Sequence, residues 1–351
     1  MSSDSVRNIL VIRRDNIGDL VCTTPLLTGL RQRYPQAHLA VLVNSYNAPV
    51  LQGHPAIDEL YIYEKAKHRA PGQSRWGCYR QTLATLWRMR RRRWQRVYLA
   101  GAGYSARAAA FVRWLRCDEV IGFAAEQGHS QHLTAAVDAG QTAQQHHVES
   151  VYQLGQQDRL PQPIGPLTIC ANPELRQQLL ASLTPAVRRL GVHISARKPS
   201  QRWPVEQWQA LLSKVRSHRP DWQILLFWSP GAEDDPRHPG DDGKAQAILT
   251  ALASEQVVPM PTQQLDQLIA GLDLCDQVFC SDGGAMHVAA GLGKPLVCLF
   301  GETNPANWHP WGVPYQLLQA PSRQVADISV EQVWQALLQQ ADSVGRQEAL
   351  A

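Results

Sequence analysis

The chain has 351 residues, of which 44% are apolar and 18% are charged. This length is sufficient for two domains of ordinary size, and the composition is typical of a globular protein and excludes a disordered one. The charge is uneven, because residues 1–120 hold 19 Lys and Arg against 8 Asp and Glu, whereas the remainder holds 15 against 22. The basic first third predicts an anionic partner for that part of the chain.

Composition also indicates where the protein works. The first residues, MSSDSVRNIL, lack the apolar core of a signal peptide, and no uninterrupted apolar run is long enough to span a bilayer. The seven cysteines form no C-x-x-C pair, which is typical of reduced thiols in the cytoplasm. The histidine clusters at 129–132 and 146–147 lack companions at zinc-site spacing, so we expect no metal.

Short apolar runs alternate with amphipathic stretches up to residue 123. This rhythm predicts strands joined by helices, in a parallel sheet with helices on both faces. Leu83, Leu86 and Trp87 have helical spacing, and we expect them to face inward. The predicted strands cover 7–13, 38–44, 96–100 and 119–123, and the predicted helices cover 19–35, 78–93 and 105–115.

The rhythm breaks in the Gln-, Ala- and His-rich segment 124–165, where we expect a connecting helix near 146–158 and then a Pro-rich linker. It restarts with predicted strands at 188–194, 222–228, 277–281 and 295–301, and predicted helices at 205–218, 244–254, 265–272 and 330–341. The sequence therefore predicts an α/β protein with domains at 1–160 and 161–325 and a closing helix and tail at 326–351. Ligands of open parallel sheets bind at the carboxyl ends of the strands, here in the cleft between the two domains.

The first predicted strand runs into RRDNIGDL, residues 13–20. A Gly-Asp pair at the start of a helix delivers a carboxylate to the carboxyl edge of the sheet. Asp19 could there accept a proton or bind hydroxyl groups. Alternatively, Asp15 or Asp19 simply caps the helix.

Three strand ends of the second domain carry groups that bind anions or hydroxyls. The loop SARKPSQRWP, residues 195–204, is either a pyrophosphate clamp or a solvated basic loop, and its candidate residues are Ser195, Arg197, Lys198 and Arg202. The acids of WSPGAEDDP, with Glu233 and Asp235 as candidates, could hold ribose hydroxyls or cap the next element. The stretch SDGGAMHVAAGLGKPLVCLFG places glycines and a histidine where a strand meets a helix, and such turns bind phosphates. Together these ends favour a nucleoside diphosphate.

Three motifs in this order resemble glycosyltransferase family 9, the ADP-heptose:lipopolysaccharide heptosyltransferases and their relatives. They are IGDLVCTTPLL, KPSQRWP and SDGGAMHVAAGLGKPLVCLFGETNPANWHPWG, and the resemblance spans about residues 8–312. It implies a GT-B fold, with two Rossmann-like domains whose parallel sheets face a central cleft. It also implies inverting, metal-independent transfer from an ADP-sugar, which is a substrate, so no cofactor is expected.

The resemblance also assigns roles to residues of this chain. Asp19 resembles the catalytic base, and Asp282 the acid that holds sugar hydroxyls. Gly283 and the amides of Gly284, Ala285 and Met286, with His287, would hold the diphosphate as charge develops on the leaving ADP. The candidate acceptor-binding residues are Gly18, Lys65, Lys67, Arg69, Tyr104 and Arg107. The implied partners are a nucleotide-sugar donor, an anionic glycolipid or glycan acceptor, and the inner leaflet by peripheral contact.

The sequence departs from the family pattern at three places. Gln201 stands where the family often has Lys two residues before the Trp-Pro pair, and Lys198 or Arg202 could substitute. Asp235 matches a ribose-binding Glu but is one methylene shorter. The loop GAGYSAR replaces an Asp-Leu-Gln-Gly type sequence on the acceptor side, so the acceptor could differ from an inner-core heptose or Kdo acceptor.

Other functions stay open. GAGYSA, residues 101–106, matches a dinucleotide-binding fingerprint, but it comes late in its domain and explains nothing in the second half. WRMRRRRWQR, residues 87–96, would suit a nucleic acid or an anionic leaflet, or be a solvated helix end; we expect no nucleic acid. A nucleotide-sugar epimerase shares the GT-B fold. Donors other than ADP-heptose, linked to ADP, UDP or GDP, and acceptors outside lipopolysaccharide also remain.

Overall fold

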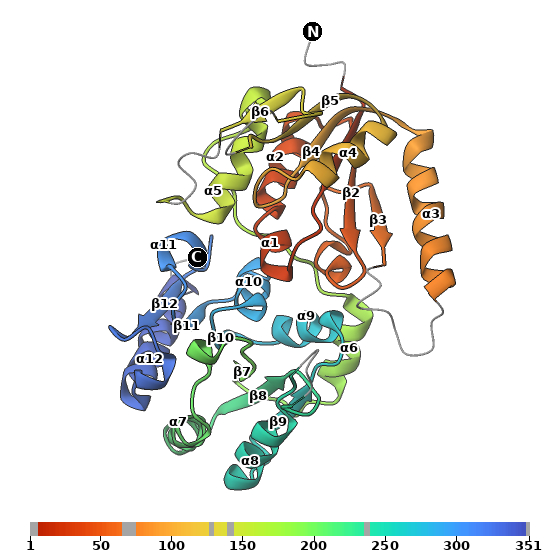
Figure 1. The fold of residues 1–351 in the computed structure, drawn as a ribbon. Coiled ribbons are helices and arrows are strands. Elements are labelled where there is room, and N and C mark those ends of the chain that lie inside the picture. Colours follow the sequence, from red (N-terminus) through yellow and green to blue (C-terminus); the bar gives the residue numbers. More distant parts are fainter. Residues whose placement is uncertain (1–5, 65–74, 126–129, 139–143, 235–238, 349–351) are drawn as a thin grey trace. The chain divides into compact units, whose positions relative to one another are not determined.

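The computed structural model describes residues 6–64, 75–125, 130–138, 144–234 and 239–348. The chain forms two compact units, Met1–Cys170 and Ala171–Ala351, whereas the predicted boundary was 160/161. Each unit is built around one six-stranded sheet (Figure 1). The C-terminal helix, predicted as a separate closing element, packs into the core of the second unit through Trp334 and Leu337.

The first sheet is parallel throughout, as the alternating pattern predicts. Its strands in spatial order are β3 (Glu59–Tyr63), β2 (His38–Asn44), β1 (Asn8–Ile12), β4 (Arg93–Leu99), β5 (Arg116–Phe123) and β6 (Ala135–Val137). The strands β1, β2 and β3 are added toward one edge of the sheet, and β4, β5 and β6 are then added toward the other edge. This reversal of strand order between β1 and β4 is the Rossmann arrangement. The carboxyl ends of β1 and β4 are therefore the expected ligand-binding edge of this unit.

Helices cover both faces of the first sheet, because side chains alternate along each strand. Leu10 and Ile12 of β1 pack with Val112 of α4 on one face, while Ile9 and Val11 are buried on the other. The helices are α1 (Ile17–Val21), α2 (Thr24–Arg33), α3 (Arg75–Arg91), α4 (Ala106–Trp114) and α5 (His147–Tyr152), with 3₁₀ turns η2 (Ala48–Leu51) and η5 (Gln153–Asp158).

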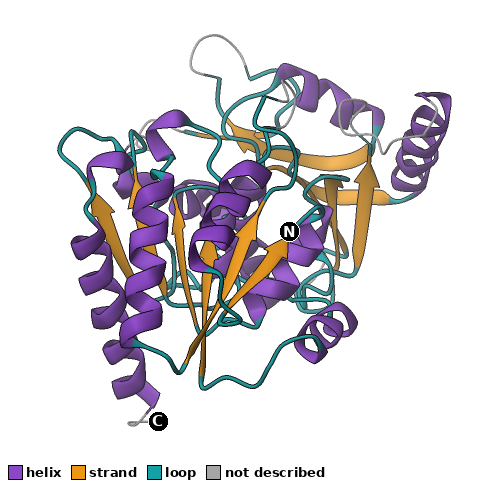
Figure 2. Ribbon diagram, turned by 90° about the horizontal axis from the view of Figure 1, so that it is seen from below, coloured by secondary structure: helices purple, strands orange, loops and turns teal. Residues whose placement is uncertain are grey.

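The second sheet repeats the same strand order and is also parallel. Its strands in spatial order are β12 (Tyr315–Gln319), β11 (Leu296–Phe300), β10 (Gln277–Ser281), β7 (Arg188–His193), β8 (Trp222–Trp228) and β9 (Val257–Pro261). The helices are α6 (Pro173–Ala181), α7 (Val205–His218), α8 (Asp242–Leu252), α9 (Leu265–Asp273), α10 (Gly284–Gly291), α11 (Pro305–Trp308) and α12 (Val330–Glu348), with 3₁₀ turns η6 (Pro199–Gln201) and η7 (Val325–Asp327). Figure 2 shows the strands of this layer flanked by helices.

The central strands were predicted and the edge strands were not. β8 is buried along its whole length, and six of its seven residues are apolar. By contrast β3, β6, β9 and β12 are half-exposed, and β9 contains two prolines, which edge strands tolerate. Half-buried edges carry a mixed pattern that is hard to distinguish from a loop.

The single helix predicted over 19–35 is wrong, because the chain forms two helices. Pro25 at the start of α2 has no N–H to donate to the carbonyl of Val21. The Thr24 hydroxyl donates to that carbonyl instead, at 2.8 Å, and the Thr23 hydroxyl donates to the carbonyl of Asp19 at 2.9 Å. The helix therefore ends and restarts within two residues. The helix predicted over 146–158 is likewise α5 followed by the 3₁₀ turn η5.

The inward orientation predicted for α3 is also wrong for two residues. Leu83 and Trp87 are 56% and 58% exposed, whereas Met89 is buried. Three buried or half-buried positions, Thr85, Leu86 and Met89, form the inner face of the helix, and Leu83 and Trp87 belong to the opposite face. The apolar spacing predicts the helix, but it does not show which side of the helix faces the sheet.

Candidate active site

Asp19 lies in the first turn of α1, directly beyond the carboxyl end of β1. The Asn16 backbone N–H and side-chain amide donate to its Oδ2 at 3.2 and 3.0 Å. The carboxylate therefore does cap its helix, which was one of the two interpretations of this motif. Its other oxygen, Oδ1, is engaged by residues from elsewhere in the unit.

Arg13 is the main partner of that oxygen. Its side chain is fully buried, and its Nη2 donates to Asp19 Oδ1 at 2.8 Å. The same nitrogen lies 2.9 Å from Nε2 of His147, the first residue of α5, and Nη1 donates to the carbonyl of Ala100. Arg13 Nε lies 3.3 Å from the carboxylate of Asp15. One guanidinium thus connects two carboxylates, an imidazole and the end of β4.

These contacts set the charge of the group. Burial alone raises the pKa of the Asp19 carboxyl, but Arg13, His147 and the Asn16 hydrogen bonds outweigh burial and leave that pKa below its usual value. Burial and the charge of Arg13 lower the pKa of His147 to about 4, although Asp19 opposes this. At neutral pH the pair is therefore a carboxylate beside a neutral imidazole, which can accept the Arg13 proton at Nε2.

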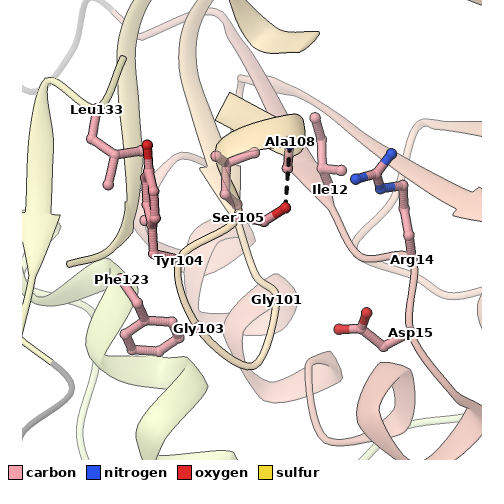
Figure 3. A pocket seen from close by; sticks show the side chains of 12 residues that line it. Ile12, Arg14, Asp15, Gly101, Gly103, Tyr104, Ser105, Ala108, Phe123 and Leu133 are labelled. Carbon is pink, nitrogen blue, oxygen red and sulfur yellow. Dashed lines mark hydrogen bonds between the residues drawn. The ribbon is translucent and has the colours of Figure 1, made fainter. Parts of the chain in front are cut away.

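A pocket of about 80 Å³ opens at the same sheet edge (Figure 3). Its wall is mostly apolar, with Arg14 and Asp15 on one side and Tyr104 on the opposite side. The Tyr104 hydroxyl donates to the carbonyl of Gln131 at 3.0 Å, and Ser105 caps α4 through Ala108. The lining residues are Ile12, Arg14, Asp15, Leu99, Gly101, Gly103, Tyr104, Ser105, Ala108, Gly122, Phe123 and Leu133.

The other acceptor-side candidates lie outside this pocket. Gly18 is the second residue of α1, beside Asp19. Arg107 is exposed on α4 and is absent from the pocket lining. Lys65, Lys67 and Arg69 lie outside the described residues.

In the second unit, Asp282 follows β10 directly and is 8% exposed. Its Oδ2 accepts a hydrogen bond from the Gln201 amide at 2.5 Å, and that amide also donates to the Thr303 hydroxyl at 3.2 Å. Burial raises the pKa of Asp282, although the hydrogen bond from Thr303 and the charge of Lys198 act in the opposite direction. Asp282 is thus held by neutral groups, unlike Asp19.

The approach of two loops makes this arrangement possible. The loop after β11 passes so close to η6 that a Cβ on Gly301 would lie 2.4 Å from the carbonyl oxygen of Ser200. Glycine is required there, because real Cβ atoms do not approach to that distance. The contact brings Thr303 and Gln201 together beside Asp282.

The predicted substitutes for the family Lys behave differently from each other. Lys198 is exposed and acts on Asp282 through its charge. Arg202 Nε donates to the carbonyl of Ala196 at 3.1 Å, and its Nη1 lies 3.9 Å from Glu233, which is 82% exposed. The Gln201 side chain itself takes the position against Asp282.

The helix α10 begins two residues beyond Asp282, after Gly283, with Gly284, Ala285 and Met286 in its first turn. Within the described residues, no side chain caps this helix start. Its first N–H groups are therefore available to an anion. His287 is 3% exposed, and its ring meets the Trp308 ring edge-on, with centroids 5.7 Å apart.

The remaining donor-side candidates are spread over neighbouring loops. The Ser195 hydroxyl accepts from the backbone N–H of Ser229 at 2.9 Å and so ties the loop after β7 to the loop after β8. Arg197 is exposed. Asp235 lies outside the described residues.

Sequence reasoning missed three residues of these networks. Arg13 and Thr303 lie within motifs already quoted, RRDNIGDL and LFGETNP, but nothing local marks them as partners of a carboxylate. His147 was considered only as a metal ligand. Across the described part of the chain, no group of three or more His, Cys, Asp and Glu side chains comes together as metal ligands. The helices in that part are all too short or too polar to cross a bilayer.

Two Rossmann-like units with parallel sheets of the same strand order form the architecture of the GT-B glycosyltransferase fold. The model of "Glycosyltransferase family 9 (heptosyltransferase)" matches residues 86–336, and the chain belongs to this family. It is a glycosyltransferase, and the predicted family and fold are confirmed.

Individual relatives agree with this assignment. The chain is 24% identical to lipopolysaccharide heptosyltransferase 2 of Salmonella typhimurium, over 85% of this chain and 83% of that protein. It is 25% identical to lipopolysaccharide heptosyltransferase 1 of Pseudomonas aeruginosa, over 85% and 79%. Among solved structures, E. coli ADP-heptose lps heptosyltransferase II has a TM-score of 0.75 at 24% identity, covering 95% of this chain and 98% of that one. A family 9 glycosyltransferase from Veillonella parvula has a TM-score of 0.76 at 20% identity, covering 97% and 98%.

Proposed function

We propose that the protein is an inverting, metal-independent glycosyltransferase that moves a heptose from an ADP-sugar to a lipopolysaccharide-core or related glycan. Residues 1–160 would bind the acceptor and residues 161–325 the donor, in the cytoplasm at the inner face of the inner membrane. The observation that carries the proposal is Asp19, a carboxylate kept ionised by a buried arginine in a family 9 chain.

Asp19 acts as general base in this proposal. It takes the proton of the acceptor hydroxyl while that oxygen bonds to the anomeric carbon and the bond from that carbon to the ADP oxygen breaks. The electron pair of the broken bond leaves with ADP. Arg13 and His147 are positioning residues: Arg13 holds Oδ1 and keeps Asp19 ionised, and neutral His147 fixes the guanidinium. The pocket lined by Asp15 and Tyr104 would receive the acceptor sugar.

The second unit would hold the donor. The uncapped start of α10 offers backbone N–H groups to the diphosphate, which gains negative charge as the bond breaks. The charge of Lys198 acts on Asp282 and lowers its pKa, and this cation would add to the stabilisation of the diphosphate. Asp282, oriented by Gln201 and Thr303, would accept hydrogen bonds from sugar hydroxyls.

The donor and acceptor are tested first by binding and then by turnover. We expect titration calorimetry without added metal to detect ADP and not UDP, GDP or NAD⁺. Binding of UDP or GDP instead of ADP would mean that the donor is a UDP- or GDP-sugar. Binding of NAD⁺ alone would contradict the proposal that the protein transfers a sugar from a nucleotide donor. Lipopolysaccharide heptosyltransferases 1 and 2 match this chain at similar identity. Turnover should therefore be compared between a core acceptor that carries no heptose and one that already carries a single heptose.

Asp19→Asn tests the mechanism. General-base catalysis contributes roughly 10²–10⁴-fold, so turnover should fall by that factor while ADP binding is unchanged. Asp118→Asn, which removes an exposed carboxylate paired with Arg93, is the matched control and should retain turnover. Inversion is read from the anomeric coupling constant of the product, and metal independence from turnover in excess chelator. Equal turnover in Asp19→Asn and the control would exclude Asp19 as the base.

A further inference from the structure

The outer face of α3 carries two large apolar side chains among its arginines, where a surface helix is usually polar. Leu83 and Trp87 stand one helical turn apart and are 56% and 58% exposed. Trp114, at the end of α4, is 36% exposed and meets the Trp87 ring edge-on at a centroid distance of 6.1 Å. Ile62 of β3, whose carbonyl accepts from Thr85 of α3, is also 36% exposed. We name Ile62, Leu83, Trp87 and Trp114 the α3 patch.

The α3 patch lies in the most basic part of the chain. Residues 75–116 hold eleven arginines and no aspartate or glutamate. Arg88 and Arg93 are paired with Glu59 and Asp118 from outside that segment. Five exposed arginines of this segment form no ion pair within the described residues: Arg80, Arg91, Arg107, Arg113 and Arg116. Apolar side chains are therefore bordered by uncompensated positive charge.

From this combination we infer that the α3 patch is the surface by which the protein docks on an anionic lipid bilayer. Tryptophan and leucine side chains enter the boundary between headgroups and acyl chains, while arginines meet lipid phosphates. The inference deepens the proposed function, on which it rests, because a lipid-anchored acceptor is presented on such a surface. Figure 1 shows α3 at the edge of its own unit, beside the edge strand β3.

A nucleic acid fits this surface less well. Base stacking needs open aromatic faces. The ring of Phe111 is stacked against Trp114 at an interplanar angle of 27°, and the guanidinium of Arg90 lies 4.8 Å from the centroid of the Trp114 ring. Leu83 and Ile62 are aliphatic and serve neither stacking nor phosphate binding. Symmetric pairing of this face with the same face of a second copy is also disfavoured, because two such basic faces repel each other.

The test is sedimentation of the full-length protein with vesicles. One set contains about one-third phosphatidylglycerol in phosphatidylethanolamine, a charge density that attracts nearby cations, and the other set is phosphatidylcholine alone. We expect binding to the anionic vesicles that weakens with salt, and at least tenfold weaker binding to the neutral ones. The double variant Leu83→Ser/Trp87→Ser should lose at least tenfold in vesicle affinity. Val187→Ser, at an 84% exposed apolar residue of the other unit, is the matched control and should bind as the parent does.

Three outcomes would overturn the inference: parental vesicle binding by the double variant, no binding to anionic vesicles, or tight binding to duplex or single-stranded DNA that the double variant loses. ADP binding and thermal unfolding of each variant verify that it is folded. Transfer assays separate this inference from the proposed function. Transfer to a delipidated core oligosaccharide should be unchanged in the double variant, while transfer to vesicle-embedded acceptor falls. Absence of transfer to any acceptor would contradict the proposed function and leave the vesicle result standing.

Discussion

Asp19 is half-buried and Asp282 is buried, and each lies just beyond the carboxyl end of a central strand, yet the pKa values of the two carboxyls are shifted in opposite directions. The pKa of Asp19 is lowered by a fully buried guanidinium, Arg13, despite burial. The pKa of Asp282 is raised by burial, because its nearest donors are the amide of Gln201 and the hydroxyl of Thr303. Burial is common to both sites. The charge of the partner decides the direction in which the pKa is shifted.

Removing the cation from the first site should have the largest effect. Arg13→Met leaves the carboxylates of Asp15 and Asp19 without their buried partner, and breaking such a pair costs about 3–5 kcal/mol of unfolding free energy. Because the pKa of Asp19 then rises, the acid limb of the pH–rate profile should move to higher pH. Urea unfolding and the pH profile measure these effects.

Arg13→Lys is the control for charge, since it keeps a cation but loses the forked geometry. Its stability and acid limb should lie between those of the parent and Arg13→Met. If Arg13→Met kept the parental acid limb, Arg13 would not be the group that lowers the pKa of Asp19. The contrast between the two carboxyls would then fail.

His147 sharpens the comparison, because it is the neutral partner at the charged site. Its pKa is lowered to about 4 in the folded protein, against about 6.5 for a free histidine. Between these pH values the unfolded chain binds a proton that the folded chain refuses, so stability is full above about pH 6.5 and declines as the pH falls toward 4. His147→Gln, which keeps an acceptor for Arg13, should remove up to about 3 kcal/mol of this acid-induced loss.

The measurement is urea unfolding of His147→Gln and the parent between pH 7 and 4.5. His54 and His193, whose pKa values are also lowered by burial to about 4, titrate alike in both proteins and cancel in the difference. Parallel stability curves for the two proteins would mean that His147 is not held neutral by the fold.

Gln201→Lys makes the second site resemble the first. An ammonium beside Asp282 should lower the pKa of that carboxyl and add positive charge for the diphosphate. We expect ADP affinity to rise about tenfold, which is about 1.4 kcal/mol. Calorimetric titration measures it, and Gln201→Met, which removes the hydrogen bond at similar volume, should instead bind ADP no better than the parent. Weaker ADP binding by Gln201→Lys would show that a neutral partner is needed at this position.

Thr303→Val should give the smallest effect. It removes one hydroxyl that donates to Asp282, so the pKa of Asp282 should rise further and the unfolding free energy should fall by about 1 kcal/mol. Urea unfolding compares it with Thr303→Ser, which keeps the hydroxyl and should match the parent. A loss in Thr303→Ser with none in Thr303→Val would assign the stabilisation to the methyl group instead.

The difference between central and edge strands explains how much of the fold was predictable. The central strands β1, β8 and β10 are buried on both faces, so most of their residues are apolar and the sequence alone predicts them as strands. The edge strands β3 and β12 are half-exposed, and only pairing with a neighbour makes them strands. The break between α1 and α2 required knowing which carbonyl Pro25 leaves unsatisfied and that Thr24 satisfies it.

The sequence by itself determined the residues that end the strands: Asp19 after β1, Asp282 after β10, and the glycines that open α10. It did so because a buried strand, a polar turn and a helix are local patterns. Tertiary structure alone decided the partners of those residues. Arg13 meets His147 across 134 residues, and Gln201 meets Asp282 and Thr303 across 81 and 102 residues. Such contacts depend on how the sheets fold, and they determine in which direction the pKa of each carboxyl is shifted.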